Sequence, residues 1–379
     1  MNEDKLELYY ESINPGTNKT DIVFFKNIDL LLKAFFANTV IQGIDGKPVI
    51  IQNKKQRRVF VTDTNVAKIP QVNDFLKTID LTEHSVITLP AGEQHKTIEN
   101  VLLIVKKALE DGHMRNSIFT GIGGGVICDM TAFAASIFKR GAKLELVPTT
   151  LLAMVDAAIG GKTGCDFDEW KNMLGTFFPA QKLYDCPDFI QNLPEEEYRS
   201  GLGEVVKTGM LYAPKLFQIM CNEKKKILSR DSEIVYEIIK RCSLAKSSIV
   251  QHDLMEKGLR MELNLGHTFG HAYESLCGLG KIPHGDAVAW GLSRSIELSM
   301  LLGYCQQDYK DDVFACLKNY GWSTDPIPPG LNKNSADDLI KIMHKDKKNS
   351  GTKIRCILQK ELNMTVIEEI SDSDIKKVL

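Results

Sequence analysis

Short apolar runs alternate with helical segments through the first half of the chain, and this alternation limits the fold more than any other feature. Strand-like runs lie within residues 57–67, 84–90, 117–122 and 143–148. Between them, residues 97–112 carry apolar side chains at helical spacing, and a glycine-rich turn at 123–125 leads into a second helical segment. Strands that alternate with helices predict a largely parallel sheet with helices on both faces.

The pattern becomes mainly helical after about residue 190. Residues 193–211, 233–254, 263–276 and 285–303 read as helices, and residues 353–359 and 364–370 read as short strands. A chain of 379 residues has room for two domains. We therefore predict an α/β fold with a parallel-sheet domain over residues 1–190 and a mainly α-helical domain over residues 191–379.

Charge and cysteine usage exclude several classes of protein. The 47 Lys and Arg residues nearly balance the 49 Asp and Glu residues, so the chain lacks the broad basic surface of non-specific nucleic-acid binders. The nine cysteines include no CxxC pair, and the N-terminus has no apolar signal segment, which together predict a reducing, cytoplasmic compartment.

The apolar run 117–138 carries Asp129 and three glycines, and a central charge costs about 2.5–3.5 kcal/mol in a membrane span. A buried strand, turn and helix explain this run better than a membrane span does.

The glycine turn is a candidate phosphate site. Gly123, Gly124 and Gly125 follow a strand and precede a helix, where backbone N–H groups can approach a pyrophosphate. The sequence GIGGGV does not fit the GxGxxG fingerprint, so tight packing explains the turn equally well. Asp63 and Asn65 end an earlier strand and could contact a ribose, although a simple Asx-turn is the favoured interpretation of that pair alone.

A histidine cluster suggests a metal site. His267 and His271 lie four residues apart on one helical face, His284 follows, and Glu204 lies upstream. Two histidines and a carboxylate suit Zn²⁺ or a related divalent ion with open positions for substrate. Helical histidines can equally be ordinary surface residues, and spacing alone does not separate the two interpretations.

Several cations interrupt apolar or glycine-rich segments, and buried cations need anionic partners. A phosphate and a carboxylate of a substrate would supply them, while internal salt bridges are the safer interpretation for any single lysine. The cations are Arg140, Lys162, Lys171, Lys207, Lys246 and Arg260, with Asp156, Asn172 and Asn264 among them.

Taken together, these segments resemble the dehydroquinate synthase family of sugar-phosphate cyclases. The resemblance runs in the family's order from about residue 60 to 350, through GEQHKT, GGGVICDMTAF, FKRG, PTTLLAMVDAAIGGKTG, KNMLGTFF, LPEEEYRSGLGEVVKTG, NLGHTFGHA, PHGDAVAWG and DKKN. It implies an N-terminal Rossmann-like NAD-binding domain, an α-helical metal-binding domain, an active site in the cleft between them, and a homodimer.

The resemblance also implies the role of individual residues. The metal, Zn²⁺ or Co²⁺, would bind to Glu204, His267 and His284. NAD contacts carry over to Asp63, Asn65, Glu93, Lys96, Gly124, Gly125, Val126, Asp129, Thr149, Thr150 and Lys171. Substrate contacts carry over to Asp156, Lys162, Asn172, Lys207, Lys246, Arg260, Asn264, His271 and Lys347, and Arg140 would reach the phosphate from the neighbouring subunit.

The implied reaction belongs to the shikimate pathway of aromatic amino-acid biosynthesis. It converts 3-deoxy-D-arabino-heptulosonate 7-phosphate into 3-dehydroquinate and phosphate, and the NAD is used catalytically. Related cyclases act on sedoheptulose 7-phosphate or glucose 6-phosphate, which lack a carboxylate. Lys246 and Arg260 match the pair expected to hold a carboxylate, so their presence favours an acid substrate, and an aminodehydroquinate synthase would share it.

Two other classes compete with this interpretation. A metal-dependent polyol dehydrogenase of the same fold would not need Lys162, Lys246, Arg260 and Lys347 together, and a non-catalytic NAD-binding protein should have lost the metal ligands. The sequence departs most from the family at 165–170, where Cys165, Asp166 and Phe167 replace the usual Asn-His. This segment directly precedes Lys171 and Asn172, for which the resemblance implies NAD and substrate contacts.

Overall fold

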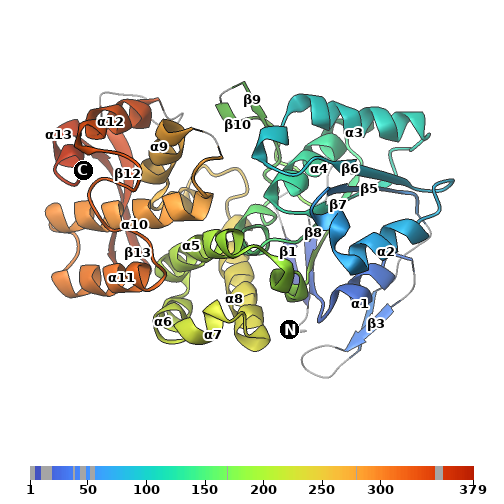
Figure 1. The fold of residues 1–379 in the computed structure, drawn as a ribbon, viewed down its shortest axis with the longest axis horizontal. Helices are drawn as coiled ribbons and strands as arrows, with labels where there is room; N and C mark the ends of the chain where they lie inside the picture. Colours follow the sequence, from blue (N-terminus) through green and yellow to red (C-terminus); the bar gives the residue numbers. More distant parts are fainter. Residues whose placement is uncertain are drawn as a thin grey trace. The chain divides into compact units, whose positions relative to one another are not determined.

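The computed structural model describes residues 5–9, 19–36, 39–42, 48–51, 56–168, 170–278, 280–345 and 353–379. Lys347, a predicted substrate contact, lies outside these residues. The chain forms two compact units, Met1–Pro194 with Lys246–Met255, and Glu195–Ala245 with Glu256–Leu379 (Figure 1). The first unit holds a parallel sheet and the second is mainly helical, so the predicted fold class is confirmed.

The sheet of the first unit has seven strands in the order β1-β2-β11-β8-β7-β5-β6. Six neighbouring strands, from β2 to β6 in that order, run parallel, and β1 pairs antiparallel with β2 at one edge. The strands are β1 (Lys5–Tyr9), β2 (Lys19–Phe24), β5 (Arg58–Asp63), β6 (Ser85–Leu89), β7 (Ile118–Gly123), β8 (Lys143–Pro148) and β11 (Lys182–Asp185). Separate two-stranded pairs are β3 (Thr39–Gln42) with β4 (Pro48–Ile51), and β9 (Cys165–Phe167) with β10 (Trp170–Leu174).

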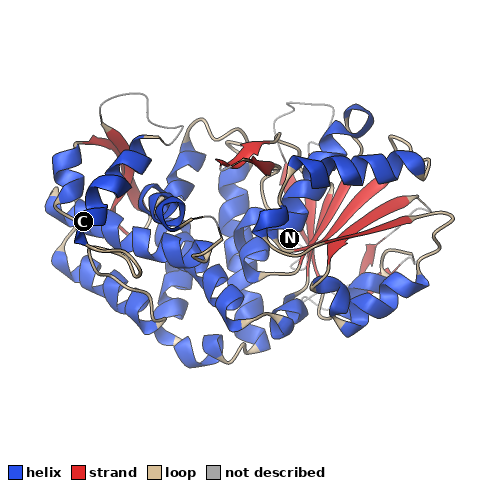
Figure 2. Cartoon of the chain, turned by 45° about the horizontal axis from the view of Figure 1, so that its top comes forward, coloured by secondary structure: helices blue, strands red, loops and turns tan. Residues whose placement is uncertain are grey.

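Helices lie above and below this sheet in Figure 2, as the alternation in the sequence predicts. Every residue of β5 and β7 is buried, which is typical of parallel strands covered on both faces. The α-helices are α1 (Ile28–Lys33), α2 (Pro70–Thr78), α3 (Ile98–Glu110) and α4 (Gly125–Ile137). Shorter helical turns are η1 (Val66–Lys68), η2 (Glu93–His95), η3 (Phe138–Arg140), η4 (Ala153–Ala157) and η5 (Pro187–Asn192).

The apolar run 117–138 forms β7, a glycine turn and α4. A Cβ added at Gly123 would lie 2.5 Å from Cβ of Ile127, so this turn requires glycine at its first position. No helix among the described residues is both long and apolar enough to cross a bilayer. After Pro148 the chain forms the short turn η4, in which the backbone widens to a π-helical pattern.

His113 is a buried neutral histidine between β6 and β7, and it makes stability depend on pH. It is 0% exposed; its Nε2 lies 2.8 Å from Oγ of Ser85, and its Nδ1 lies 3.2 Å from Oγ of Ser117. Burial, followed by the charge of Arg57, lowers the pKa of His113 from 6.5 to about 4. In the unfolded chain His113 therefore becomes protonated below pH 6.5, whereas in the folded chain it becomes protonated only below about pH 4.

We expect stability to fall across that window by about 3 kcal/mol from this residue alone, at 1.36 kcal/mol per pKa unit. In the variant His113→Gln, the difference in unfolding free energy between pH 7 and pH 4 should shrink by about that amount. Urea titrations at the two pH values measure it, and an unchanged difference would contradict the assignment of His113 as a neutral buried group.

The second unit packs helices around a short hairpin. Its α-helices are α5 (Glu195–Tyr212), α6 (Pro214–Asn222), α7 (Lys224–Leu228), α8 (Ser232–Val250, whose last turn belongs to the first unit), α9 (His267–Cys277), α10 (His284–Leu301), α11 (Gln307–Asn319), α12 (Ala336–His344) and α13 (Asp372–Lys376). The hairpin is β12 (Ile354–Glu361) with β13 (Met364–Ile370), and the short turns are η6 (Leu259–Asn264) and η7 (Lys333–Ser335). Phe269 of α9, Trp290 of α10, Leu339 of α12 and Leu358 of β12 share one core cluster. This core fixes α9 and α10, which each begin with a histidine.

The helix expected over residues 263–276 begins only at His267. Residues up to Asn264 form the 3-10 turn η6, and Gly266 has a φ of 79°, a left-handed conformation that interrupts the helical path. The break leaves His267 in the first turn of α9, where its ring is not covered by a preceding helical turn.

Candidate functional site

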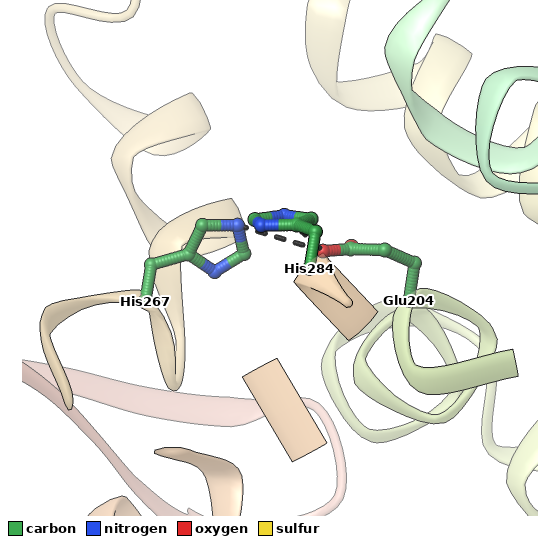
Figure 3. Close-up of side chains that lie close together, drawn as sticks. All are labelled: Glu204, His267 and His284. Atoms are coloured by element: carbon green, nitrogen blue, oxygen red, sulfur yellow. Dashed lines mark ion pairs between the residues drawn. The ribbon is translucent and has the colours of Figure 1, made fainter. Parts of the chain in front are cut away.

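Three predicted metal ligands meet in the helical unit. Glu204 lies within α5, His267 begins α9 and His284 begins α10, and Figure 3 shows their side chains converging. Oε1 of Glu204 lies 3.5 Å from Nε2 of His267 and 3.4 Å from Nε2 of His284. The three donor atoms lie within 4.8 Å of one another.

Glycines bring these three helices into backbone contact. A Cβ on Gly285 of α10 would collide with the carbonyl oxygen of Ser200 in α5, and one on Gly203 would collide with that of Gly285. A Cβ on Gly291 of α10 would likewise collide with the carbonyl oxygen of Gly266, next to α9. Only glycine permits such close approach, so these residues place the three ligands at one point.

The spacing of the donor atoms fits a small divalent cation. Zinc binds nitrogen and oxygen donors at about 2.0–2.1 Å in tetrahedral geometry, which separates neighbouring donors by about 3.4 Å. The two separations that involve Glu204 are 3.4 and 3.5 Å. Three protein donors also leave a coordination position for a substrate, as in catalytic zinc sites.

Electrostatics keep two of the ligands in the binding form. Glu204 is 0% exposed, and although burial alone would raise the pKa of this carboxyl, Lys207 and His284 lower it to about 2. Nζ of Lys207 forms an ion pair with Oε2 of Glu204. Burial, with the charge of Lys207, holds the pKa of His267 well below 6.5. His267 is therefore neutral and offers a lone pair.

Glu274 lies directly behind one of the predicted ligands, and the sequence analysis did not single it out. It is 3% exposed on α9, and its Oε2 lies 3.2 Å from Nδ1 of His284. Burial alone would lower the pKa of His284, but Glu274 and Glu204 raise it to about 10. Glu274 follows His267 by seven residues on the same helical face, and that spacing was the available signal.

We expect Glu274→Gln to weaken metal binding about 10–100-fold, because a carboxylate behind a ligating histidine orients the ring and raises its basicity. Competition with a chelator measures the dissociation constant. Glu233→Gln, on the first turn of α8, is the control and should bind metal like the wild type. Wild-type affinity in the Glu274 variant would contradict this role.

His271 and several predicted substrate contacts lie in the same unit. The ring centroid of His271 lies 5.1 Å from that of His267 and 5.9 Å from that of His284. Arg260 is 1% exposed in η6, and Nδ2 of Asn264 donates to Oε1 of Glu256 at 2.6 Å. The unit therefore combines the metal cluster with a buried guanidinium close to it in sequence.

Four further predicted substrate contacts, Asp156, Lys162, Asn172 and Lys246, belong to the first unit, as does Arg140. Nζ of Lys246, which is 6% exposed, lies 2.7 Å from Oδ1 of Asp156. Lys162 and Arg140 are exposed, and Asn172 is exposed on β10. Internal ion pairs, the alternative for single lysines, are thus observed for Lys246 with Asp156 and for Lys207 with Glu204.

Predicted nucleotide contacts gather where parallel strands end. Asp63 ends β5, Gly124 caps α4 directly after β7, and Thr149 follows β8. Oδ1 of Asp63 accepts from the backbone N–H groups of Asn65 at 2.8 Å and Val66 at 2.9 Å, which is the Asx-turn geometry. Oγ1 of Thr149 is buried without a hydrogen-bond partner among the described residues. The edge of the sheet thus offers to a ligand the N-terminus of α4, which has no side-chain cap, and the hydroxyl of Thr149.

Two further predicted nucleotide contacts, Asp129 and Glu93, act on the charge of Lys96. Its Nζ lies 2.7 Å from Oδ2 of Asp129 and 2.6 Å from Oδ1 of Asn172. Burial opposes its charge, but Asp129 and Glu93 raise the pKa of Lys96 above its ordinary value, so it stays charged. Val126 lies in the first turn of α4, Oγ1 of Thr150 accepts from the N–H of Ala153, and Lys171 is half-buried on β10.

Comparison with known proteins decides the family. Residues 86–200 match the model of the 3-dehydroquinate synthase N-terminal domain, and residues 201–349 match that of the C-terminal domain. The 3-dehydroquinate synthase of Acidithiobacillus ferrooxidans is 38% identical over 309 residues, which cover 81% of this chain and 83% of the relative. The chain belongs to the 3-dehydroquinate synthase family. Another member, from Pelobacter propionicus, is 31% identical over 95% of this chain and 96% of its own length.

Solved structures share the fold of this 3-dehydroquinate synthase family member. A 2-deoxy-scyllo-inosose synthase complexed with carbaglucose-6-phosphate, NAD⁺ and Co²⁺ has a TM-score of 0.81 at 18% identity, covering 99% of this chain and 98% of that one. A 2-epi-5-epi-valiolone synthase from Streptomyces hygroscopicus, with NAD⁺ and Zn²⁺, also has a TM-score of 0.81, at 22% identity and 97% coverage of both chains. A glycerol dehydrogenase from Schizosaccharomyces pombe scores 0.62 at 13% identity, covering 98% of this chain and 90% of its own, so the polyol dehydrogenases share the architecture.

Proposed function

We propose that this chain is a 3-dehydroquinate synthase. It would convert 3-deoxy-D-arabino-heptulosonate 7-phosphate into 3-dehydroquinate and phosphate, a step of the shikimate pathway. The observation that carries the proposal is the convergence of Glu204, His267 and His284 in a family member that covers most of its relatives' length. The polyol dehydrogenase and non-catalytic alternatives have weaker support, because the chain retains both the ligand cluster and the cations.

The described residues fit both cofactors that the related cyclases contain. Glu204, His267 and His284 would hold Zn²⁺ or Co²⁺, and the ends of β5, β7 and β8 with Lys96 and Asp129 would hold NAD. When bound, NAD would supply reversible hydride transfer at a ring alcohol of the substrate, and the metal would lower the pKa of that alcohol.

The chain's own residues would bind and orient an anionic substrate. Lys162 and Lys207 are cations that can stabilise the leaving phosphate, while Lys246 and Arg260 can bind a carboxylate, and such charges act most strongly where water is excluded. Arg260 is buried, and its planar guanidinium suits a carboxylate better than a hydroxyl. Asp156 neutralises Lys246 in the absence of substrate. These features favour an acid substrate over sedoheptulose 7-phosphate.

We also propose that the chain acts as a cytoplasmic homodimer in which Arg140 serves the neighbouring subunit. Arg140 is exposed, and it and Lys139 have φ values of 64° and 47°, a strained left-handed conformation typical of functional positions. The side chain of Arg115 donates to the carbonyl oxygens of Arg140 and Gly141, which holds this turn in place. Nine free cysteines suit a reducing compartment.

Phosphate release tests the proposed function. The wild-type protein with NAD⁺ and Zn²⁺ should release phosphate from the heptulosonate phosphate without net NADH formation, and should release much less from sedoheptulose 7-phosphate. Preference for sedoheptulose 7-phosphate would overturn the substrate assignment, and net NADH formation with glycerol would favour a polyol dehydrogenase. Turnover of the amino analogue of the heptulosonate phosphate in preference to the parent would point to an aminodehydroquinate synthase.

A further inference from the structure

The segment that departs most from the family forms the hairpin of β9 and β10. Its strands pair antiparallel through Trp170 with Phe167 and Leu174 with Cys165, with an irregular register between these pairs. The hairpin is joined to α4, since the N–H of Gly164 donates to the carbonyl oxygen of Asp129 at 3.3 Å. Asp166 belongs to β9 and is neither a predicted metal ligand nor a predicted NAD or substrate contact, so the proposed function assigns it no role.

Asp166 belongs to a closed ring of three hydrogen bonds. Its carboxylate Oδ1 accepts from the backbone N–H of Asn172 at 2.7 Å, and its own N–H donates to the carbonyl oxygen of Lys96 at 2.7 Å. Nζ of Lys96 donates to Oδ1 of Asn172 at 2.6 Å, which closes the ring. Asp166, Lys96 and Asn172 are therefore each held by the other two.

The ring holds Asn172 in an unusual conformation. Asn172 has a φ of 52°, in the left-handed region that few residues other than glycine adopt. Such a conformation costs free energy and persists only where the surroundings maintain it. Oδ1 of Asp166 supplies that support, because it accepts a hydrogen bond from the backbone N–H of Asn172.

The ring also fixes which way the side chain of Asn172 points. With its N–H bound to Asp166, Asn172 directs Oδ1 at the buried ammonium of Lys96, which is also paired with Asp129. Loss of the Asp166 carboxylate would leave Lys96 paired with Asp129 but would release the backbone of Asn172. Loss of this carboxylate should therefore change the position of Asn172 but leave the ion pair between Lys96 and Asp129 intact.

We propose that Asp166 is a positioning residue that holds Asn172 in place for the sugar-phosphate substrate. The inference rests on the proposed function, in which Asn172 contacts substrate and Lys96 with Asp129 contacts NAD. Asp166 acts through its acceptor oxygen, and its negative charge is secondary. An amide at position 166 should therefore preserve the ring, while a methyl group should not.

Kinetics and NAD binding test the proposal. Asp166→Ala should raise KM for the heptulosonate phosphate at least tenfold, with kcat and the dissociation constant of NAD within about threefold of wild type. Asp166→Asn should keep KM within about threefold. The control Asp168→Asn alters an exposed carboxylate of the same hairpin, at a φ of 50° that asparagine tolerates, and should match wild type. Equal losses of substrate and NAD binding in Asp166→Ala, or an Asp166→Asn variant as poor as Asp166→Ala, would overturn the proposal.

Hydrogen exchange gives a readout that does not depend on activity. In peptides that span residues 165–176, the amide of Asn172 should exchange at least tenfold faster in Asp166→Ala than in wild type, and Asp166→Asn should restore protection. In the background Asn172→Ala, the further change Asp166→Ala should leave KM unchanged, since Asp166 acts through Asn172. If wild type releases no phosphate, the proposed function fails, and hydrogen exchange still decides whether Asp166 holds Asn172. Unaltered protection in Asp166→Ala would refute the positioning role.

Discussion

The variant His267→Ala should lose both metal binding and turnover. His267 supplies one of three donors, and its low pKa keeps the ring in the neutral, metal-binding form. Removing even a hydrogen-bond partner behind a ligating histidine costs about 10–100-fold in metal affinity, so loss of the ligand itself should cost more than about 100-fold. Metal content should fall from about one ion per chain to a small fraction of that after dialysis.

Elemental analysis of the purified protein and competition with a chelator measure the loss. His344→Ala is a matched control, because His344 pairs with Asp372 on the surface of the same unit and should leave metal content unchanged. A His267→Ala protein with one tightly bound metal ion and normal phosphate release would refute the metal site. Thermal unfolding of both variants checks that the helical unit remains folded.

The variant Arg260→Ala should bind the acid substrate far more weakly than it binds NAD. A hydrogen bond to a charged group contributes about 1.5–3 kcal/mol, so kcat/KM for the heptulosonate phosphate should fall about 10–150-fold. The dissociation constant of NAD should change less than threefold, because the predicted NAD contacts belong to the other unit. Steady-state kinetics and calorimetric NAD titration provide the two values.

The variant Arg260→Lys separates charge from geometry. Lysine keeps the positive charge but lacks the planar fork that binds a carboxylate through two parallel hydrogen bonds, so its loss should be intermediate. Equal losses for substrate and NAD in Arg260→Ala would mean that this buried side chain supports the fold. A loss confined to sedoheptulose 7-phosphate would contradict the carboxylate role.

Local patterns in the sequence predicted the architecture well. The alternation of apolar runs with helical spacing indicated the parallel sheet, and the structure confirms six parallel strands in it. The lone charge of Asp129 in a glycine-rich run indicated a strand, turn and helix, which are β7 and α4. The sequence could predict these features because the spacing of apolar residues in strands and helices involves only residues that are close together in the sequence.

The candidate site was only partly predictable. The spacing of His267 and His271 placed both on one helix, but their approach to Glu204 depends on glycine contacts between helices far apart in the sequence. The sequence did not indicate the contact of Glu274 with His284, because the two residues lie on different helices. The roles of the predicted NAD and substrate residues stay predictions, since only their placement in the two units is now described.

The sequence by itself determined the central parallel strands, most of the long helices, the fold class and, through several long motifs, the family. Only the tertiary structure decided which side chains meet. It joined Lys246–Met255 to the first unit, set Oε1 of Glu204 between two histidine nitrogens, and closed the ring of Asp166, Lys96 and Asn172. The physical reason is the distance between the interacting residues along the sequence. Strand and helix periodicity involves residues that are close together in the sequence, whereas these contacts depend on the close packing of backbones and side chains from distant segments.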